Sequence, residues 1–273
     1  MKLKDRVAIV TGGSRGIGRA ICLALAEEGA DIVLSCDRDV AGAEAVASEI
    51  RALGRRAKAV QADVAQSADV ERMVQQAWEE FGRADILVNN AGIFIGSPIA
   101  EVREEDWERV MDVNVKGAFL CCQAVGRRWI QEGSKGRASI SSAARGTIVN
   151  IASIAGQMPE VNGAAYSPSK AAVLMLTRLL AVEWAQYGIR VNSLSPGPIL
   201  TPLQRAAYPT AELLAARNLA VPLNRHGTPE EMAKVAVFLA SDDASYVTGA
   251  DFAADGGSLA SMYHLVRQLS KHA

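Results

Sequence analysis

The sequence predicts an α/β domain with a doubly wound parallel sheet of about seven strands and helices on both faces. Short apolar runs alternate with helical segments along the 273 residues, which is the pattern of right-handed β-α-β units. The runs are rich in Val, Ile, Leu and Ala, as expected of parallel strands buried on both faces. The first run ends in the glycine-rich turn TGGSRGIG. With no linker or repeat in this order, we expect one domain over residues 1–273.

Each expected strand is a short apolar run. In chain order the expected strands are Val7–Thr11, Asp31–Cys36, Ala57–Gln61, Ile86–Asn89, Gly146–Ala152, Arg190–Leu194 and Asp251–Ala253. The expected helices between them are Arg19–Glu28, Val40–Leu53, Asp69–Phe81, Glu104–Ile130, one after Tyr166 and one after Thr228. Glycines end the first two helices, as is common at helix C-termini. Thr228 and Glu231 form a capping box around Pro229, which suits the first helical position.

Three segments depart from this regular order. The polar stretch 131–145 is rich in serine and glycine and joins a helix to a strand at the amino-terminal edge of the sheet, so we expect a surface-loop insertion there. The long segment 199–227 is punctuated by proline, and we expect it to be a substrate lid with pocket residues such as Leu213 and Leu214, or ordinary helix packing. The tail 258–273 has apolar residues at helical spacing, which predicts a short helix that packs on a subunit surface or closes over the site.

Composition and charge exclude several classes of partner. Lys plus Arg number 29 and Asp plus Glu number 30, so capture of nucleic acid or of an acidic membrane is not expected. Four cysteines lie in apolar segments without a CxxC pair, which indicates buried, reduced thiols. The three histidines lack metal-ligand spacing, so no metal site is expected. We see no signal-peptide pattern and no apolar run near the ~20 residues that span a bilayer, and we expect a cytoplasmic protein.

The glycine-rich turn after the first strand is typical of a nucleotide site. Gly12, Gly16 and Gly18 allow a tight turn and a close approach of the backbone to a pyrophosphate at a helix N-terminus. Asp37 ends the second strand at the ~20-residue spacing of a carboxylate that accepts from the ribose 2′-hydroxyl of NAD. Arg15 favours the 2′-phosphate of NADP instead. Each residue is also compatible with an ordinary turn or an exposed surface charge.

A tyrosine and a lysine at i, i+4 spacing are candidates for acid–base chemistry. Tyr166 and Lys170 project from one face of the expected helix. An ordinary phenol has a pKa near ~10, and a nearby ammonium lowers it toward working pH. Ser153 ends the preceding strand, where its hydroxyl can bond a substrate oxygen, and Asn114 can brace a water chain near the lysine. Taken singly, these residues are equally typical of core packing and of solvent-facing polar groups.

Together these motifs resemble the short-chain dehydrogenase/reductase family, from Lys4 to about Gly257. The motifs that match are TGGSRGIG, Asp63 in QADV, NNAG at Asn89–Gly92, Asn114 in VNVKG, Ser153, Tyr166 with Lys170, Pro196-Gly197 and DGG at Asp255–Gly257. The resemblance implies a single Rossmann-type domain and an oxidoreductase that uses NAD or NADP.

The resemblance also implies a role for each site residue. Tyr166 would be the general acid/base, Ser153 would orient the substrate oxygen, Lys170 would lower the tyrosine pKa and bind the nicotinamide ribose, and Asn114 would support a proton relay. Asp63 would lie near the adenine, and the residues after the sixth strand would lie near the carboxamide. The residues implied to contact the coenzyme are Gly12, Ser14, Arg15, Gly16, Ile17, Gly18, Asp37, Asp63, Val64, Asn90, Ala91, Gly92, Tyr166, Lys170, Pro196, Gly197, Ile199 and Thr201.

The resulting hypothesis is an enzyme that interconverts a secondary alcohol and a ketone by hydride transfer to or from nicotinamide. By family analogy it would be a homotetramer with a small-molecule substrate. NAD is favoured because an acid at Asp37 disfavours a 2′-phosphate, although NAD-preferring members usually carry the acid one position earlier, at Cys36 here. Two rival hypotheses are a non-catalytic NAD(P)-binding regulator and a sugar-nucleotide epimerase or dehydratase, which usually shows GxxGxxG and a larger C-terminal domain.

Overall fold

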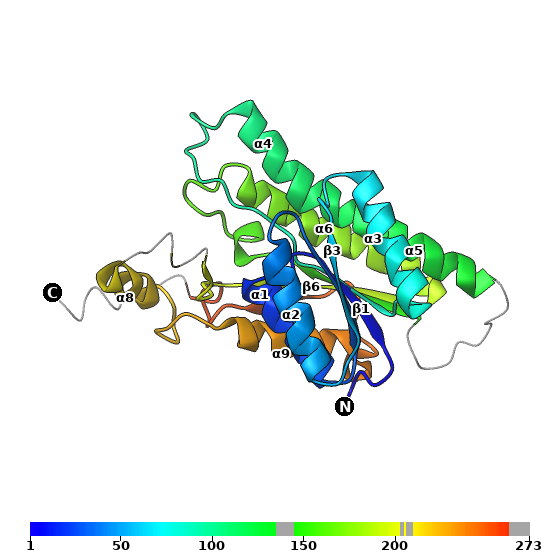
Figure 1. Ribbon diagram of the computed structural model, residues 1–273. Coiled ribbons are helices and arrows are strands. Elements are labelled where there is room, and N and C mark those ends of the chain that lie inside the picture. The colour runs from blue at the N-terminus through cyan, green and yellow to red at the C-terminus, as the bar shows by residue number, and fades with distance from the viewer. Residues whose placement is uncertain (135–144, 203–204, 206–209, 262–273) are drawn as a thin grey trace.

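The described part of the chain forms one parallel sheet of seven strands (Figure 1). This computed structural model describes residues 1–134, 145–202, 205 and 210–261. The strands are β1 (Val7–Val10), β2 (Asp31–Cys36), β3 (Ala57–Gln61), β4 (Ile86–Asn89), β5 (Gly146–Ile151), β6 (Ile189–Pro196) and β7 (Asp251–Ala254). Their order is β3-β2-β1-β4-β5-β6-β7, so the topology reverses between β1 and β4. The predicted doubly wound sheet is confirmed, and ligands of such sheets bind beyond the strand carboxyl ends at this reversal.

Helices cover both faces of the sheet (Figure 1). The longer helices are α1 (Gly16–Glu27), α2 (Val40–Ala52), α3 (Ser67–Phe81), α4 (Glu104–Met111), α5 (Gly117–Ser134), α6 (Tyr166–Trp184), α8 (Ala211–Leu219) and α9 (Pro229–Ala240). Helices α1, α2 and α9 share one apolar core with the sheet, while α3, α5 and α6 share the other. The apolar strands are therefore buried on both sides, as their sequence predicts.

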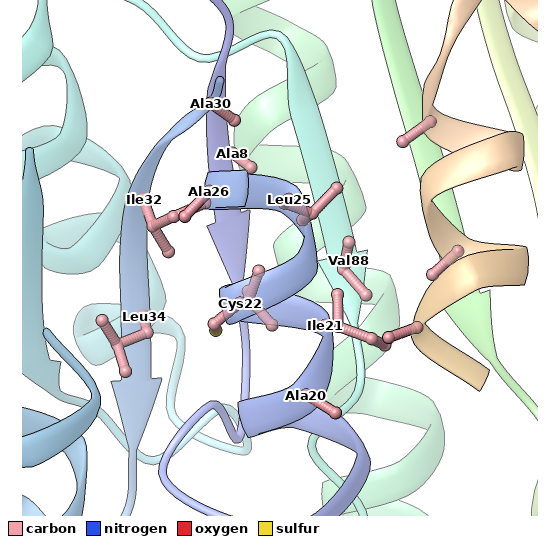
Figure 2. Packing of buried hydrophobic residues seen from close by; sticks show 14 of the residues in the cluster. Ala8, Ala20, Ile21, Cys22, Leu25, Ala26, Ala30, Ile32, Leu34 and Val88 are labelled. Carbon is pink, nitrogen blue, oxygen red and sulfur yellow. The ribbon is translucent and has the colours of Figure 1, made fainter. Parts of the chain in front are cut away.

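The alternation of side chains along β1 separates the two cores. Ala8 and Val10 face the core that holds α1, whereas Ile9 faces the core that holds α3. Figure 2 shows Ile21 and Leu25 on the side of α1 that lies nearest Val88 of β4. Both side chains have 0% exposure, and burying a side chain of this size contributes about 1.5–3 kcal/mol. This packing fixes the start of α1 over the carboxyl end of β1.

The helix expected over Glu104–Ile130 contains a π-helical turn that the sequence analysis did not predict. The turn η1 (Asp112–Lys116) joins α4 to α5, and the Gly117 N–H bonds to the Asp112 carbonyl. Such turns insert one residue into a helix and are frequent at functional sites. Here the turn buries Asn114, which is 2% exposed, on the side of the helix that faces α6.

The three irregular segments are described only in part. Residues 135–144 of the expected insertion and 262–273 of the expected tail lie outside the described residues. In the expected lid, residues 203–204 and 206–209 also lie outside, while α8 is described and begins after Thr210, whose hydroxyl accepts from the Leu213 N–H at 3.3 Å. The capping box of α9 is confirmed. The Thr228 N–H donates to the Glu231 carboxylate at 2.8 Å, and the Glu231 N–H donates to the Thr228 hydroxyl at 3.2 Å.

Candidate active site

Tyr166 and Lys170 lie at the start of α6, beside the carboxyl end of β5. The Lys170 side chain is buried, and its Nζ donates to the Ile151 carbonyl at 2.9 Å. The same Nζ lies 5.6 Å from the centroid of the Tyr166 ring. Ser153 lies close enough to the Tyr166 phenol to lower the tyrosine pKa, and Phe94 packs edge-on against the tyrosine ring with centroids 5.1 Å apart. The structure thus brings three of the predicted catalytic side chains into one cluster.

Asn114 links this cluster to the loop that follows β4. Its Oδ1 accepts from the Ile93 N–H at 2.8 Å, while its Nδ2 donates to the Ile93 carbonyl and to Ser169 Oγ, both at 3.0 Å. A Cβ placed on Gly92 would lie 3.3 Å from Asn114 Oδ1 and 3.5 Å from Lys170 Nζ. Asn114 therefore holds the loop against α6 and keeps the backbone of Gly92 beside the lysine.

Burial controls the ionisation of the two titratable groups. Burial raises the pKa of Tyr166 above its ordinary value, the hydrogen bond from Ser153 lowers it, and the charge of Glu160 raises it again. Burial lowers the pKa of Lys170 to about 8. The i, i+4 spacing predicts that the Lys170 ammonium lowers the pKa of Tyr166. In the chain alone the pKa of Tyr166 is raised, because removing the phenolate from water outweighs the stabilising contacts.

A cavity of about 260 Å³ opens beside the tyrosine. It is lined by residues of the β5–α6 connection, of the chain after β6 and of α8. These residues are Ser153, Ile154, Ala155, Met158, Pro159, Glu160, Tyr166, Gly197, Pro198 and Arg217. The expected lid residues Leu213 and Leu214 do not line this cavity, whereas Arg217 of the same helix does. A substrate in the cavity would contact both Ser153 and Tyr166.

The glycine-rich turn is held by the residues that follow β4. The Asn90 side-chain amide donates to the carbonyls of Thr11 and Gly12, each at 2.9 Å. The Thr11 hydroxyl accepts from the backbone N–H groups of Asn90 and Ala91, each at 3.0 Å. A Cβ on Gly18 would lie 2.1 Å from the Gly12 carbonyl oxygen. Only glycine fits at position 18, so α1 starts in direct contact with the turn.

The N-terminus of α1 suits a pyrophosphate. Gly16 begins the helix with a φ of 56°, and in the described chain no side chain caps this terminus and no acidic residue lies in its first turn. Unbonded N–H groups at a helix start attract phosphate oxygens. Thr201 lies opposite, since a Cβ on Gly16 would be 3.7 Å from Thr201 Cγ2. Ser14 and Ile17 flank the same turn and are half-buried.

Two carboxylates and an arginine form an ion-pair cluster beyond β2 and β3. Arg109 of α4 lies 3.7 Å from Asp37 Oδ2 and 3.1 Å from Asp63 Oδ2. Asp37 is also 3.4 Å from Arg38, while Asp63 Oδ1 accepts from the Ala65 N–H at 2.9 Å. The predicted adenosine-binding acids are thus drawn together by a cation from a third element. Val64, which follows Asp63, is buried.

The residues after β6 lie against the closing DGG motif. A Cβ on Gly197 would be 2.6 Å from the Asp255 Cα, so the two turns are in contact. Ile199, which follows in the chain after Pro196, is buried. The backbone on both sides of it pairs with Gly227: the Leu200 N–H donates to the Gly227 carbonyl, and the Gly227 N–H donates to the Pro198 carbonyl, each at 2.9 Å. This segment places Gly197 at the cavity while Thr201 reaches the start of α1.

Most predicted site residues therefore gather at the carboxyl edge of the sheet. One group surrounds Tyr166 and the cavity, and the other surrounds the glycine-rich turn and the two carboxylates. Three charged residues that the sequence analysis did not select also lie there: Arg109 in the carboxylate cluster, and Glu160 and Arg217 at the cavity. No motif marks them. Arg109 follows Asp63 by a whole helix and strand, and Arg217 lies on a helix whose apolar residues had suggested the pocket contacts.

Comparison with known proteins gives consistent matches. A family model described as enoyl-(acyl carrier protein) reductase matches residues 12–258. A 3-oxoacyl-[acyl-carrier-protein] reductase of Synechocystis sp. is 41% identical and aligns over 93% of this chain and 97% of its own. The D-threitol dehydrogenase of Mycolicibacterium smegmatis is 39% identical over 94% of each chain. A crystal structure described as an NAD(P)-dependent gluconate 5-dehydrogenase from Beutenbergia cavernae, with NADP bound, is 40% identical with a TM-score of 0.86, covering 95% of this chain and 99% of that one.

The fold and the site define an NAD(P)-dependent oxidoreductase that interconverts an alcohol and a ketone. The chain belongs to the short-chain dehydrogenase/reductase family. The relatives are dehydrogenases and ketoreductases, which does not favour the regulator or the epimerase hypothesis. Across the described ranges, no helix is long and apolar enough to cross a membrane, and no three His, Cys, Asp or Glu side chains form a metal cluster.

Proposed function

We propose that Tyr166 is the general acid/base of this alcohol–ketone interconversion and that Ser153 holds the reacting oxygen. The observation that carries this proposal is the position of Ser153 and Tyr166 side by side in the wall of one cavity. In oxidation, the substrate alcohol gives its proton to the Tyr166 oxygen while Ser153 bonds the same substrate oxygen. In reduction, the phenol returns that proton to the oxygen of the former carbonyl.

Lys170 supports this proton transfer from below the tyrosine ring. When bound, the coenzyme supplies the hydride acceptor or donor at nicotinamide C4 and, in its oxidised form, a positive charge near the phenol. Positive charge beside a buried phenol favours the phenolate and opposes the effect of burial on the pKa of Tyr166. The bond from Lys170 to Ile151 holds the ammonium in place for the nicotinamide ribose. Asn114 keeps the loop at Gly92 against this lysine and, in our proposal, supports the proton relay.

The glycine-rich turn and the ends of three strands fit the rest of the coenzyme. We assign the pyrophosphate to the uncapped start of α1, with Ser14, Arg15 and Ile17 beside it. The adenosine lies between Asp37, Asp63 and Val64, and the carboxamide lies near Gly197 and Thr201. The support for this assignment is the uncapped start of α1 together with the tight packing of the glycine-rich turn, where a Cβ on Gly18 would collide with the Gly12 carbonyl. We further assign segment 199–227 to a substrate lid, since Arg217 of α8 reaches the cavity.

Turnover of a panel of secondary alcohols and ketones tests the proposed function. Each compound is assayed with NAD or NADP, or with the reduced forms, at the absorbance band of the reduced nicotinamide. We expect turnover in both directions for at least one alcohol–ketone pair. A panel of polyols, sugar acids, cyclic alcohols, steroids and 3-oxoacyl thioesters that gives no turnover with either coenzyme would contradict it.

We propose that NAD is the preferred coenzyme. Asp37 is half-exposed at the end of β2, where its carboxylate accepts from a 2′-hydroxyl and repels a 2′-phosphate. Arg38 and Arg109, the cations best placed to bind such a phosphate, are both paired with this carboxylate. Arg15, the exposed N-cap residue of α1, is the residue that favours NADP.

Asp37→Ala should shift the coenzyme preference toward NADP. The substitution removes the repulsive carboxylate and releases Arg38 and Arg109, so a 2′-phosphate gains charge-assisted hydrogen bonds of ~1.5–3 kcal/mol each. We expect the ratio of kcat/KM for NADP to kcat/KM for NAD to rise by about 10- to 100-fold. Glu71→Ala, which removes one exposed carboxylate from α3, serves as the charge-matched control. An unchanged ratio would show that Asp37 does not contact the ribose.

We propose that the protein is a cytoplasmic homotetramer. One face of α6 carries the exposed apolar side chains Met175, Leu179 and Val182, which are 59%, 51% and 80% exposed. They follow i, i+4, i+7 spacing, so they form one stripe on the helix. Phe119 of α5 is 42% exposed, and α5 touches α6 where the Gly126 backbone meets the Trp184 ring. Burying this surface against a second copy removes a large apolar area from water.

Val182→Glu should break the assembly into smaller species. A charge in the middle of an apolar interface loses water without gaining a partner, which costs several kcal/mol per copy. Light scattering coupled to size-exclusion chromatography measures the mass directly. Leu53→Glu at the end of α2, where the parent side chain is 49% exposed, is the control and should leave the mass unchanged. A Val182→Glu protein with the mass of the parent protein would rule out α6 as the interface.

A further inference from the structure

Arg217 reaches the cavity from α8 and has no ion-pair partner among the described residues. It lines the same cavity as Ser153 and Tyr166 and is half-buried. Within the described ranges no carboxylate lies within ion-pair distance of it, whereas Arg225 in the same segment pairs with Glu231 at 2.6 Å. A guanidinium that lines a cavity and forms no ion pair there is available to an anionic group of the ligand.

Glu160, which is exposed, supplies a charge of the opposite sign to the lining of the same cavity. Its backbone is fixed by two bonds: its N–H donates to Ser167 Oγ at 3.1 Å, and its carbonyl accepts from the Gly163 N–H at 2.9 Å. Glu160 lies near enough to Tyr166 to raise the tyrosine pKa, whereas Arg217 lies near enough to His226 to lower the histidine pKa. The cavity is thus lined by a carboxylate from the β5–α6 connection and by a guanidinium from α8.

The two charges select different groups of one substrate. The fork of Arg217 matches the two oxygens of a carboxylate. Glu160, an acceptor when ionised, binds a hydroxyl and repels a second acid near the tyrosine. The volume of about 260 Å³ lies below the roughly 300–1,000 Å³ of pockets for drug-sized ligands, which favours a small polar molecule over a steroid nucleus.

We propose that the substrate is a small polyhydroxylated acid, or the corresponding oxo acid. Its carboxylate pairs with Arg217, and a hydroxyl on the other side of the reacting carbon donates to Glu160. The reacting CH–OH group lies between them, at Ser153 and Tyr166. The carboxylate takes no part in the oxidation and serves to position the chain. This inference rests on the proposed function and adds the substrate class to it.

Matched pairs of aldonic acids and alditols test the inference. Acids of four to six carbons are compared with alditols of the same length and configuration, which carry CH₂OH in place of the carboxylate. We expect kcat/KM of the parent enzyme to be at least about 10-fold higher for the acids, since a charged hydrogen bond is worth ~1.5–3 kcal/mol. Arg217→Gln should lower kcat/KM for the acids by about 10- to 100-fold, mainly through KM, and change the values for the alditols by less than about two-fold.

Three further measurements separate recognition from damage to the fold. Lys234→Gln removes one exposed positive charge from α9 and should leave the acid preference intact. Arg217→Lys should restore part of that preference, because the cation returns without its fork. Calorimetric binding of an aldonic acid to the complex with reduced coenzyme should weaken in Arg217→Gln by the same factor as KM rises.

Several outcomes would overturn the inference. Equal kcat/KM for acids and alditols in the parent enzyme, or an equal loss for both in Arg217→Gln, would show that Arg217 does not read a carboxylate. Turnover of neutral alcohols alone would do the same while leaving the proposed function intact. A strong preference for hydroxy amino acids would overturn the hydroxyl assigned to Glu160. A protein that turns over and binds none of these compounds, and no other alcohol or ketone, would overturn the proposed function as well.

Discussion

Tyr166→Phe should lower kcat/KM by about 10²- to 10⁴-fold, the contribution typical of a positioned general acid/base. The substitution removes only the hydroxyl, so the edge-on packing of Phe94 against the ring at 5.1 Å is preserved. The coenzyme contacts assigned to the glycine-rich turn and to Lys170 do not involve that hydroxyl. The dissociation constant for the coenzyme, measured by nicotinamide fluorescence, should therefore change by less than about three-fold.

Tyr187→Phe is the matched control for this substitution. Tyr187 is half-buried after α6 and lies against the core formed with α3 and α5, so loss of its hydroxyl should leave kcat/KM near the parent value. Turnover by Tyr166→Phe at a rate close to that of the parent enzyme would exclude the phenol as the proton-transfer group. Loss of coenzyme binding in this variant would instead indicate that the hydroxyl supports the coenzyme site.

Lys170→Met should abolish one component of the pH dependence of stability. Burial lowers the pKa of Lys170 to about 8 from its ordinary value of 10.5, so between these values the unfolded chain holds a proton that the folded chain has released. Stability from this group therefore rises with pH in that window and is lowest below pH 8. Relative to Lys170→Met, the free energy of unfolding of the parent protein should rise by about 2 kcal/mol from pH 7.5 to 10.

Urea unfolding at a fixed protein concentration measures this difference. The subtraction of one protein from the other removes the contributions of the other groups that titrate in this range, such as the buried cysteines. Lys234→Met, at an exposed site on α9, should follow the pH dependence of the parent protein. If Lys170→Met also follows it, the lysine is not destabilised by burial. The same variant should lose turnover, because it lacks the cation beneath the tyrosine.

The sheet and its seven strands could be predicted because buried parallel strands leave a simple pattern. The run at β1 is apolar throughout, the runs at β2 and β4 are mostly apolar, and every residue of the three strands is buried. The cluster of Ser153, Tyr166 and Lys170 was also predictable, since a strand end and an i, i+4 pair fix where these side chains meet. The resemblance to one family supplied the order of the motifs, which no single residue could.

Other features depend on tertiary contacts that leave no local pattern. The π-helical turn at Asn114 adds one residue to a helix whose sequence reads as continuous. The pairing of Arg109 with two acids joins elements that are far apart in sequence. The direction of the Tyr166 pKa shift depends on burial, which spacing does not reveal. Arg217 could not be predicted, because a single arginine among the apolar residues of a helix is typical of an exposed charge, and apolar residues are the usual lining of a pocket.

The cluster of Arg109 with Asp37 and Asp63 has a consequence for a change of coenzyme. The positive charge that a phosphorylated adenosine would need is already present, neutralised by the acid that opposes it. On the assignment proposed above, one substitution at Asp37 would free these cations, Arg38 and Arg109, so a change of coenzyme would need no new pocket.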